Sequence, residues 1–171
     1  MLKIGFDLDD TINSWYPCYL KRFGQPKNDY EITKNVQRIL KHDKQFWLDL
    51  PLKNMPDFQP TLFCTARVIP KSWTKRWLEE HNIPMAPVYQ KYGYAGSKAP
   101  LIKGRVDVFV EDSLKNFIDL NLNGIPCLLI DSPANQQWGP IGRIFSLNYD
   151  EIEEAYNLFM ETVFPNFKNL L

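Results

Sequence analysis

The sequence predicts an α/β protein in which a parallel sheet is covered by helices on both faces. Short, almost continuously apolar runs of strand length recur along the chain, and stretches with helical spacing of apolar residues lie between them. Unbroken apolar runs are typical of strands buried on both faces, and the alternation with helices indicates right-handed crossovers between parallel strands. A chain of 171 residues, of which 44% are hydrophobic, is long enough to bury one such core.

Five apolar runs are predicted to form the strands of this sheet. They are LKIGFDL (2–8), TLFCTA (61–66), APVY (86–89), VDVFVE (106–111) and PCLLID (126–131). Each has the length of an ordinary strand.

Helices are predicted where apolar residues recur every three or four positions between or after these runs. The clearest examples cover residues 71–82, 113–124 and 150–164. Gly124 stands where a helix C-cap is expected, which supports the end of the second of these helices.

One segment breaks the alternation of strands and helices. More than fifty residues separate the first predicted strand from the second, whereas a single crossover helix needs far fewer. Residues 13–57 are therefore predicted to be a small helical cap inserted after the first strand, and residues 1–12 with 58–171 to form the core domain.

The composition excludes some classes of partner. Lysine and arginine number 20 and aspartate and glutamate also 20, so no overall positive field is available to bind a nucleic acid polymer or an anionic membrane. The first ten residues already contain three aspartates, and no apolar run has the length of a membrane span. We therefore expect a cytoplasmic protein without a nucleic acid or membrane partner, whose three cysteines are reduced core residues.

Two aspartates follow the first predicted strand. Asp7 and Asp9 stand two positions apart in extended chain, so their side chains face the same side, at the sheet edge where α/β proteins bind ligands. Two such carboxylates repel unless a cation neutralises them, and oxygen ligands of this kind favour Mg²⁺. Taken alone, the pattern is also common in Asx turns and helix N-caps.

A second acidic pair, Glu111 and Asp112, directly follows the fourth apolar run. Because the carboxyl ends of parallel strands meet at one edge, the two pairs are expected to lie close together. The sequence therefore predicts a Mg²⁺ site with four candidate ligands, Asp7, Asp9, Glu111 and Asp112.

The acidic motifs resemble those of the haloacid dehalogenase-like (HAD) phosphohydrolases. In that family the first core strand ends in DxDxT or DxDxV, which Asp7, Asp9 and Thr11 match, and the next ends in Thr or Ser, which Thr65 matches. The fourth motif is an acidic pair. The Glu-Asp pair in VFVEDS matches a variant seen in β-phosphoglucomutase-like members.

The third HAD motif is a lysine at the start of a helix before the fourth strand. Lys98 in GSKAPLIKG is the candidate that fits this position. Lys75 and Lys103 compete, but Lys75 stands within an amphipathic helical pattern and Lys103 is very close to the fourth strand.

Within the superfamily, the chain is most similar to the 5'(3')-deoxyribonucleotidase group and its bacterial and phage relatives. The likeness depends on FWLDLPLKNMPD, on LFCTAR followed by TKRWLEEHNIP, and on DSPANQ with the later Arg143. It implies a Rossmann-like three-layer α/β/α core with a five-stranded parallel sheet and a cap inserted after the first strand.

The resemblance also implies roles for the acidic residues. Asp7 would be the nucleophile that forms an aspartyl-phosphate, and Asp9 would be the general acid and base. Mg²⁺ would be held by the Asp7 side chain, the Asp9 backbone carbonyl and Asp112. Whether Glu111 touches the metal directly or through water stays open.

Further residues are candidates for binding the substrate. Thr65, with the adjacent Ala66, and Lys98 would bind the phosphate oxygens. Arg67 is a candidate for substrate contact, although an arginine beside a strand end is as often a surface residue.

The aromatic pair Phe46 and Trp47 would stack on a nucleobase or, alternatively, belong to the core of the cap.

The sequence thus predicts a Mg²⁺-dependent phosphomonoesterase that acts on a small phosphorylated metabolite, with a nucleoside monophosphate as first choice. One alternative is a sugar-phosphate phosphatase or phosphomutase of the same superfamily. Another, of a different class, is a non-catalytic module that binds a phosphorylated ligand.

Overall fold

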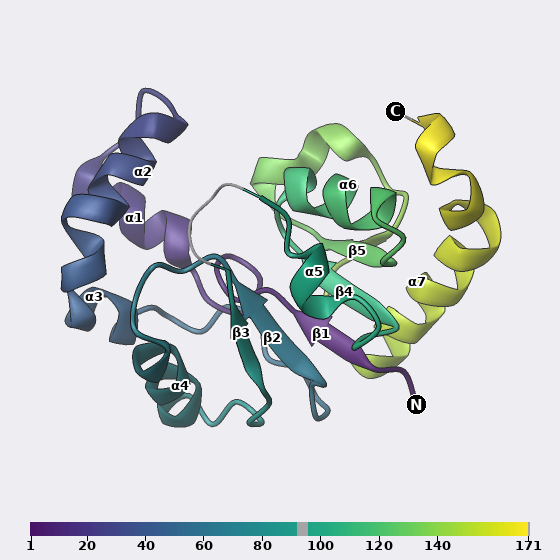
Figure 1. Ribbon diagram of the computed structural model, residues 1–171, viewed down its shortest axis with the longest axis horizontal. Coiled ribbons are helices and arrows are strands. Elements are labelled where there is room, and N and C mark those ends of the chain that lie inside the picture. The colour runs from purple at the N-terminus through teal and green to yellow at the C-terminus, as the bar shows by residue number, and fades with distance from the viewer. Residues whose placement is uncertain (92–95, 171) are drawn as a thin grey trace.

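The computed structural model describes residues 1–91 and 96–170, and its centre is a six-stranded parallel sheet flanked by helices (Figure 1). The strand order is β3-β2-β1-β4-β5-β6. The strands are β1 (Ile4–Phe6), β2 (Leu62–Thr65), β3 (Val88–Gln90), β4 (Val108–Glu111), β5 (Cys127–Ile130) and β6 (Arg143–Ile144).

Helices and short helical turns connect the strands. The α-helices are α1 (Trp15–Phe23), α2 (Asp29–Arg38), α3 (Lys44–Leu48), α4 (Lys71–Glu80), α5 (Ala99–Ile102), α6 (Leu114–Leu122) and α7 (Tyr149–Thr162). The 3₁₀ turns are η1 (Leu40–His42), η2 (Pro133–Trp138) and η3 (Phe164–Leu170). Within the described ranges, no helix has both the length and the apolar character that a membrane crossing needs.

The predicted α/β fold with a parallel sheet is confirmed, and the sheet has one strand more than expected. The additional strand, β6, pairs with β5 at the edge of the sheet and contains only Arg143 and Ile144. Two residues cannot display an alternating or continuous apolar pattern, so this strand could not be predicted from the sequence.

The central strand β1 is closely packed at Gly5. A Cβ atom there would lie 2.9 Å from a ring carbon of Phe109 and from a methyl of Val106, and 3.0 Å from a methyl of Leu62. The absence of a side chain at this position allows the flanking residues of β2 and β4 to pack over β1.

We expect Gly5→Ala to lower the free energy of unfolding by about 1–3 kcal/mol, because the added methyl forces well-packed neighbours apart. Thermal denaturation followed by circular dichroism measures the loss. Ser72→Ala on the exposed side of α4 is the control and should change the stability by less than about 0.5 kcal/mol. An unchanged midpoint in Gly5→Ala would show that the packing around β1 is looser than described.

The long connection between β1 and β2 contains α1, α2, η1 and α3, which lie together beyond one end of the sheet (Figure 1). Helix α1 carries a row of aromatic rings, Trp15, Tyr19 and Phe23, whose centroids are 5.3 Å and 5.0 Å apart in succession. Asn28 caps α2 by accepting a hydrogen bond from the Glu31 N–H. Helix α3 packs against α4, which joins this segment to the sheet.

Candidate active site

A cavity of about 240 Å³ lies at the carboxyl ends of β1, β2 and β4, between the sheet and the helices of the β1–β2 connection. Side chains from all of these elements line it. They include Asp7, Asp9, Asp10, Trp15, Trp47, Thr65, Lys98, Glu111, Asp112 and Asn116.

The loop after β1 carries Asp7 and Asp9 into this cavity. Asp7 continues the line of the sheet, because its N–H donates to the Val110 carbonyl of β4 at 3.0 Å. Asp10 then adopts a left-handed conformation, with φ at 61°, which aspartate tolerates better than most residues. Its carboxylate accepts the Tyr16 N–H at 2.9 Å, so the turn is fixed to the start of α1.

Three carboxylates form an acidic cluster at this point. Asp7, Glu111 and Asp112 each offer an oxygen atom, and these atoms lie within 4.8 Å of one another. The cluster arises because β1 and β4 are neighbours, with Phe6 beside Val110 in the register, so that the residues that follow them meet.

The acidic cluster fits a hard divalent cation such as Mg²⁺, because its donors are carboxylate oxygens and its negative charge is concentrated. Burial, reinforced by Glu111 and Asp9, raises the pKa of Asp7 to about 7, even though Lys98 opposes the shift. Burial and then Glu111 and Asp7 raise the pKa of Asp112 well above its ordinary value. A bound cation would stabilise both carboxylates in their charged forms.

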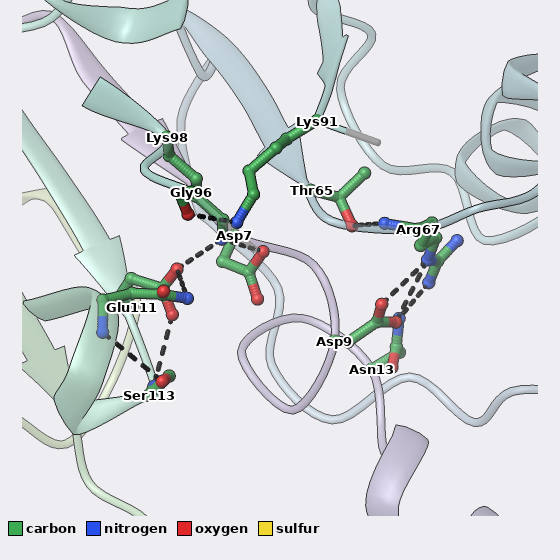
Figure 2. Close-up of polar contacts among 11 residues, drawn as sticks. Asp7, Asp9, Asn13, Thr65, Arg67, Lys91, Gly96, Lys98, Glu111 and Ser113 are labelled. Atoms are coloured by element: carbon green, nitrogen blue, oxygen red, sulfur yellow. Dashed lines mark hydrogen bonds and ion pairs between the residues drawn. The ribbon is translucent and has the colours of Figure 1, made fainter. Parts of the chain in front are cut away.

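Lys98 is the cation that the protein itself brings to the cluster. Its side chain is 2% exposed, and its ammonium group donates to Asp7 Oδ1 at 2.5 Å and to Glu111 Oε1 (Figure 2). Burial alone would lower the pKa of Lys98, but the Asp7 and Glu111 carboxylates outweigh burial and raise it. The lysine is therefore charged at neutral pH.

The two competing lysines lie elsewhere. Lys75 is exposed on α4 and lines a separate hollow with Lys71 and Met85. Lys103 is exposed and donates to the Asn123 carbonyl at 3.1 Å. Of the three lysines, the structure brings only Lys98 to the acidic cluster.

Glu111 is wholly buried and its oxygens already accept several hydrogen bonds. Oε1 accepts from Lys98 and from Asn116 Nδ2 at 2.9 Å, and Oε2 accepts from the Ser113 N–H at 3.2 Å. This leaves Asp7 and Asp112 with more capacity than Glu111 to bind a cation. Asn135 Nδ2 donates to the Asp112 carbonyl at 2.8 Å and so supports the end of β4.

The end of β2 places Thr65 and Ala66 at the cavity. Both residues line it, and Thr65 is buried. Thr65 Oγ1 accepts the Arg67 N–H at 3.4 Å, which leaves its O–H group to donate into the cavity.

Arg67 follows directly and is not a surface residue. Its side chain is 0% exposed and forms a two-pronged ion pair with Asp9, with Nη2 2.6 Å from Oδ1 and Nε 3.1 Å from both carboxylate oxygens (Figure 2). Arg67 Nη1 donates to Thr74 Oγ1 on α4 at 3.2 Å. The guanidinium carbon lies 5.1 Å from the ring centroid of Trp47.

The two aromatic candidates are placed differently. Trp47 is buried, lines the cavity and donates its indole N–H to the Leu40 carbonyl at 2.7 Å. Phe46 is half-buried and packs edge-on against Trp47, outside the set of residues that line the cavity in the described chain.

Four residues of the site were not predicted from the sequence: Asn13, Thr74, Asn116 and Asn135. Asn13 Nδ2 donates to Asp9 Oδ1 at 3.1 Å, and the others hold Arg67, Glu111 and Asp112 as described above. Asparagine and threonine in polar segments give no pattern that separates such support from ordinary turn or surface positions. The spacing of Asn13, four residues after Asp9, is the one available hint.

A larger cleft of about 910 Å³ adjoins the cavity and shares Asp10, Asp112 and Ser113 with it. One wall comes from α1 and α2, including Tyr16 and Ile32, and the other from the segment that begins α6, including Leu114. A phosphorylated molecule with its phosphate at the acidic cluster could therefore extend its remainder into this cleft.

Comparison with known proteins gives little further information. No protein-family profile and no curated protein matches the sequence. Among solved structures, a HAD-superfamily hydrolase from Ehrlichia chaffeensis is similar at 11% sequence identity and a TM-score of 0.39, over 92% of this chain and 95% of that chain. A likeness at this level assigns neither a family nor an activity. Fold and site together define an α/β protein with an acidic, lysine-containing centre at the carboxyl edge of its sheet.

Proposed function

We propose that this protein is a Mg²⁺-dependent phosphomonoesterase of the HAD type. One observation carries the proposal: the four sequence motifs converge on a single cavity, where Lys98 bridges Asp7 and Glu111 beside Asp112 and Thr65. A binding module needs neither a buried carboxylate nucleophile nor a second acid beside it, and this cavity contains both Asp7 and Asp9.

In the proposed reaction, an Asp7 carboxylate oxygen attacks the phosphorus atom of the substrate. The bond from phosphorus to the leaving oxygen breaks, and that oxygen takes a proton from the Asp9 carboxyl group. Water then attacks the aspartyl-phosphate, its proton goes to the Asp9 carboxylate, and the bond between phosphorus and Asp7 breaks. The products are the alcohol and inorganic phosphate, and both aspartates regain their starting forms.

The remaining residues bind and orient the phosphate. The Lys98 ammonium and the Thr65 hydroxyl, with the neighbouring Ala66 backbone, would hold its non-bridging oxygens. Asp7, the Asp9 carbonyl and Asp112 would hold Mg²⁺, with Glu111 acting through Lys98 rather than as a direct ligand. The ion supplies positive charge that reduces the repulsion between the anionic nucleophile and the anionic phosphate.

The proposed substrate is a nucleoside monophosphate, and residues 13–57 would act as a cap over it. The adjoining cleft supports this choice, because its volume of about 910 Å³ accommodates a nucleoside and its walls combine apolar, aromatic and polar side chains. Trp47 is only 2% exposed and packs against the Arg67 guanidinium. We therefore expect it to support Arg67 rather than to stack on a base. Tyr16, which lines the cleft, is better placed to contact a base.

A panel of nucleoside and sugar monophosphates, assayed for released phosphate with Mg²⁺ and with EDTA, tests the proposal. We expect hydrolysis of nucleoside monophosphates that falls by roughly 100-fold or more in EDTA and returns when Mg²⁺ is added. Mg²⁺ should also raise the melting temperature, because it binds the folded acidic cluster. Preference for sugar phosphates would change the substrate class, and no turnover of any compound would contradict the enzymatic function.

A further inference from the structure

The side chains of Arg67 and Asp9 differ in how much of their surface is exposed. The side chain of Arg67 is 0% exposed, whereas that of Asp9 is 23% exposed. The Asp9 carboxylate is therefore the more open of the two groups in the cavity that both residues line. The side-chain donors of Arg67 are directed at Asp9 and Thr74, and of these two only Asp9 takes part in the proposed reaction.

The two carboxylate oxygens of Asp9 accept different numbers of hydrogen bonds. Oδ1 accepts from Arg67 Nη2 at 2.6 Å, from Arg67 Nε at 3.1 Å and from Asn13 Nδ2 at 3.1 Å. In the described chain, Oδ2 accepts only from Arg67 Nε, at 3.1 Å. Arginine and the asparagine amide are donors, so Oδ2, which has fewer of them, is the oxygen with more capacity to interact with a substrate.

Arg67 itself is fixed from three directions. Thr74 on α4 accepts from Nη1 at 3.2 Å, and the guanidinium carbon lies over the Trp47 ring of α3, 5.1 Å from its centroid. Gln90 at the end of β3 donates to the Arg67 carbonyl at 2.6 Å. The Arg67 side chain that holds Asp9 is thus in contact with α4 and α3, and its backbone is bonded to the end of β3; an arginine with fixed partners of this kind can set the direction of a carboxyl group.

We infer that Arg67 is a positioning residue for proton transfer: it holds the Asp9 carboxyl group by Oδ1 so that Oδ2 faces the leaving oxygen of the substrate. This inference rests on the proposed phosphatase function and deepens it. In the first step Oδ2–H gives its proton to the leaving oxygen as the P–O bond breaks, and in the second the same oxygen receives a proton from water. Arg67 exchanges no proton in either step.

The inference predicts a loss that depends on the leaving group. A basic leaving group needs the proton from Asp9, whereas p-nitrophenolate leaves well without it, so a misaligned Asp9 should harm only the former strongly. The experiment compares kcat/KM for benzyl phosphate and p-nitrophenyl phosphate with the full chain in Mg²⁺. Both values are measured on the same preparation. Partial unfolding of a variant lowers both by the same factor and therefore leaves their ratio unchanged.

We expect Arg67→Gln to lower the benzyl to p-nitrophenyl ratio by about tenfold or more, mainly through kcat, and Asp9→Asn to lower it by about 100-fold. The double variant should match Asp9→Asn, because Arg67 acts only through Asp9. Arg76→Gln is the matched control, since Arg76 pairs with Glu80 on the exposed side of α4, and its ratio should equal that of the wild type.

An unchanged ratio in Arg67→Gln, or a rise in KM equal for both compounds, would overturn the inference and leave the phosphatase function intact. A further fall of the ratio in the double variant, beyond Asp9→Asn, would also overturn it, because Arg67 would then act by a second route. If the wild-type protein hydrolyses neither compound nor any member of the phosphate panel, the proposed function fails, and the inference fails with it.

Discussion

Asp7→Asn should reduce turnover of every phosphate monoester by roughly 10⁴-fold or more while the chain stays folded. The amide cannot attack phosphorus, and the other two carboxylates of the acidic cluster do not replace Asp7 in the proposal, because Glu111 is wholly buried and already accepts three hydrogen bonds and Asp112 would hold the metal ion. The measurement is the single-turnover release of the alcohol, because the alcohol leaves in the first chemical step, before the aspartyl-phosphate is hydrolysed. A variant with more than a few per cent of wild-type activity would contradict the assignment of the nucleophile.

The same substitution should not destabilise the metal-free protein at pH 8. Burial raises the pKa of Asp7 from 3.8 to about 7 although Lys98 opposes the shift, so the folded state favours the protonated carboxyl. The stability that this preference provides is complete below pH 3.8 and is lost as the pH rises to about 7. Asn at position 7 carries no charge, so the stability of Asp7→Asn should fall less than that of the wild type between pH 3.8 and about 7.

Thermal denaturation at several pH values in EDTA tests this expectation. Asp49→Asn, an exposed position at the end of α3, is the matched control and should keep both the activity and the pH dependence of the wild type. A steeper loss of stability with pH in Asp7→Asn than in the wild type would show that the charged carboxylate is favoured in the fold.

The sequence predicted the acidic part of the site because topology alone brings its members together. Once β1 and β4 are parallel strands of an α/β sheet, the residues after them meet at one edge, and Asp7, Glu111 and Asp112 follow from their positions. Lys98 could be predicted because it matches the lysine motif of the HAD resemblance, and in the structure it precedes α5 and contacts Asp7 and Glu111.

The surroundings of Arg67 could not be predicted in this way. Its partners come from separate segments: Asp9 is 58 positions away in the sequence, Thr74 is seven positions away, and Trp47 belongs to the β1–β2 connection. No periodic pattern encodes such a meeting, because it depends on how α3 and α4 pack against each other. The short strand β6 escaped prediction for a simpler reason, since its two residues carry no pattern.

Lys98→Met should impair both activity and stability, because the buried Lys98 ammonium group donates to both Asp7 and Glu111. We expect kcat to fall by about 10²–10³-fold through loss of charge stabilisation at the phosphate. In EDTA at pH 8, the free energy of unfolding should fall by about 3–5 kcal/mol, because two buried carboxylates lose their partner. Chemical denaturation measures this loss, with Lys75→Met on the exposed side of α4 as the control.

Two further measurements separate the loss of the charge from the loss of the side chain of Lys98. Below pH 7 the Asp7 carboxyl becomes protonated, so it no longer needs a cation and the penalty of Lys98→Met should shrink as the pH falls to 5. Adding Glu111→Gln should restore part of the stability at pH 8 without restoring turnover, because it removes one unpaired charge but supplies no donor to the phosphate. A loss of stability in Lys98→Met that does not depend on pH and is unchanged by Glu111→Gln would contradict the role of Lys98 as the counter-charge of the acidic cluster. Lys98 would then stabilise the fold through packing, which includes its contact with the Phe109 ring at 5.5 Å.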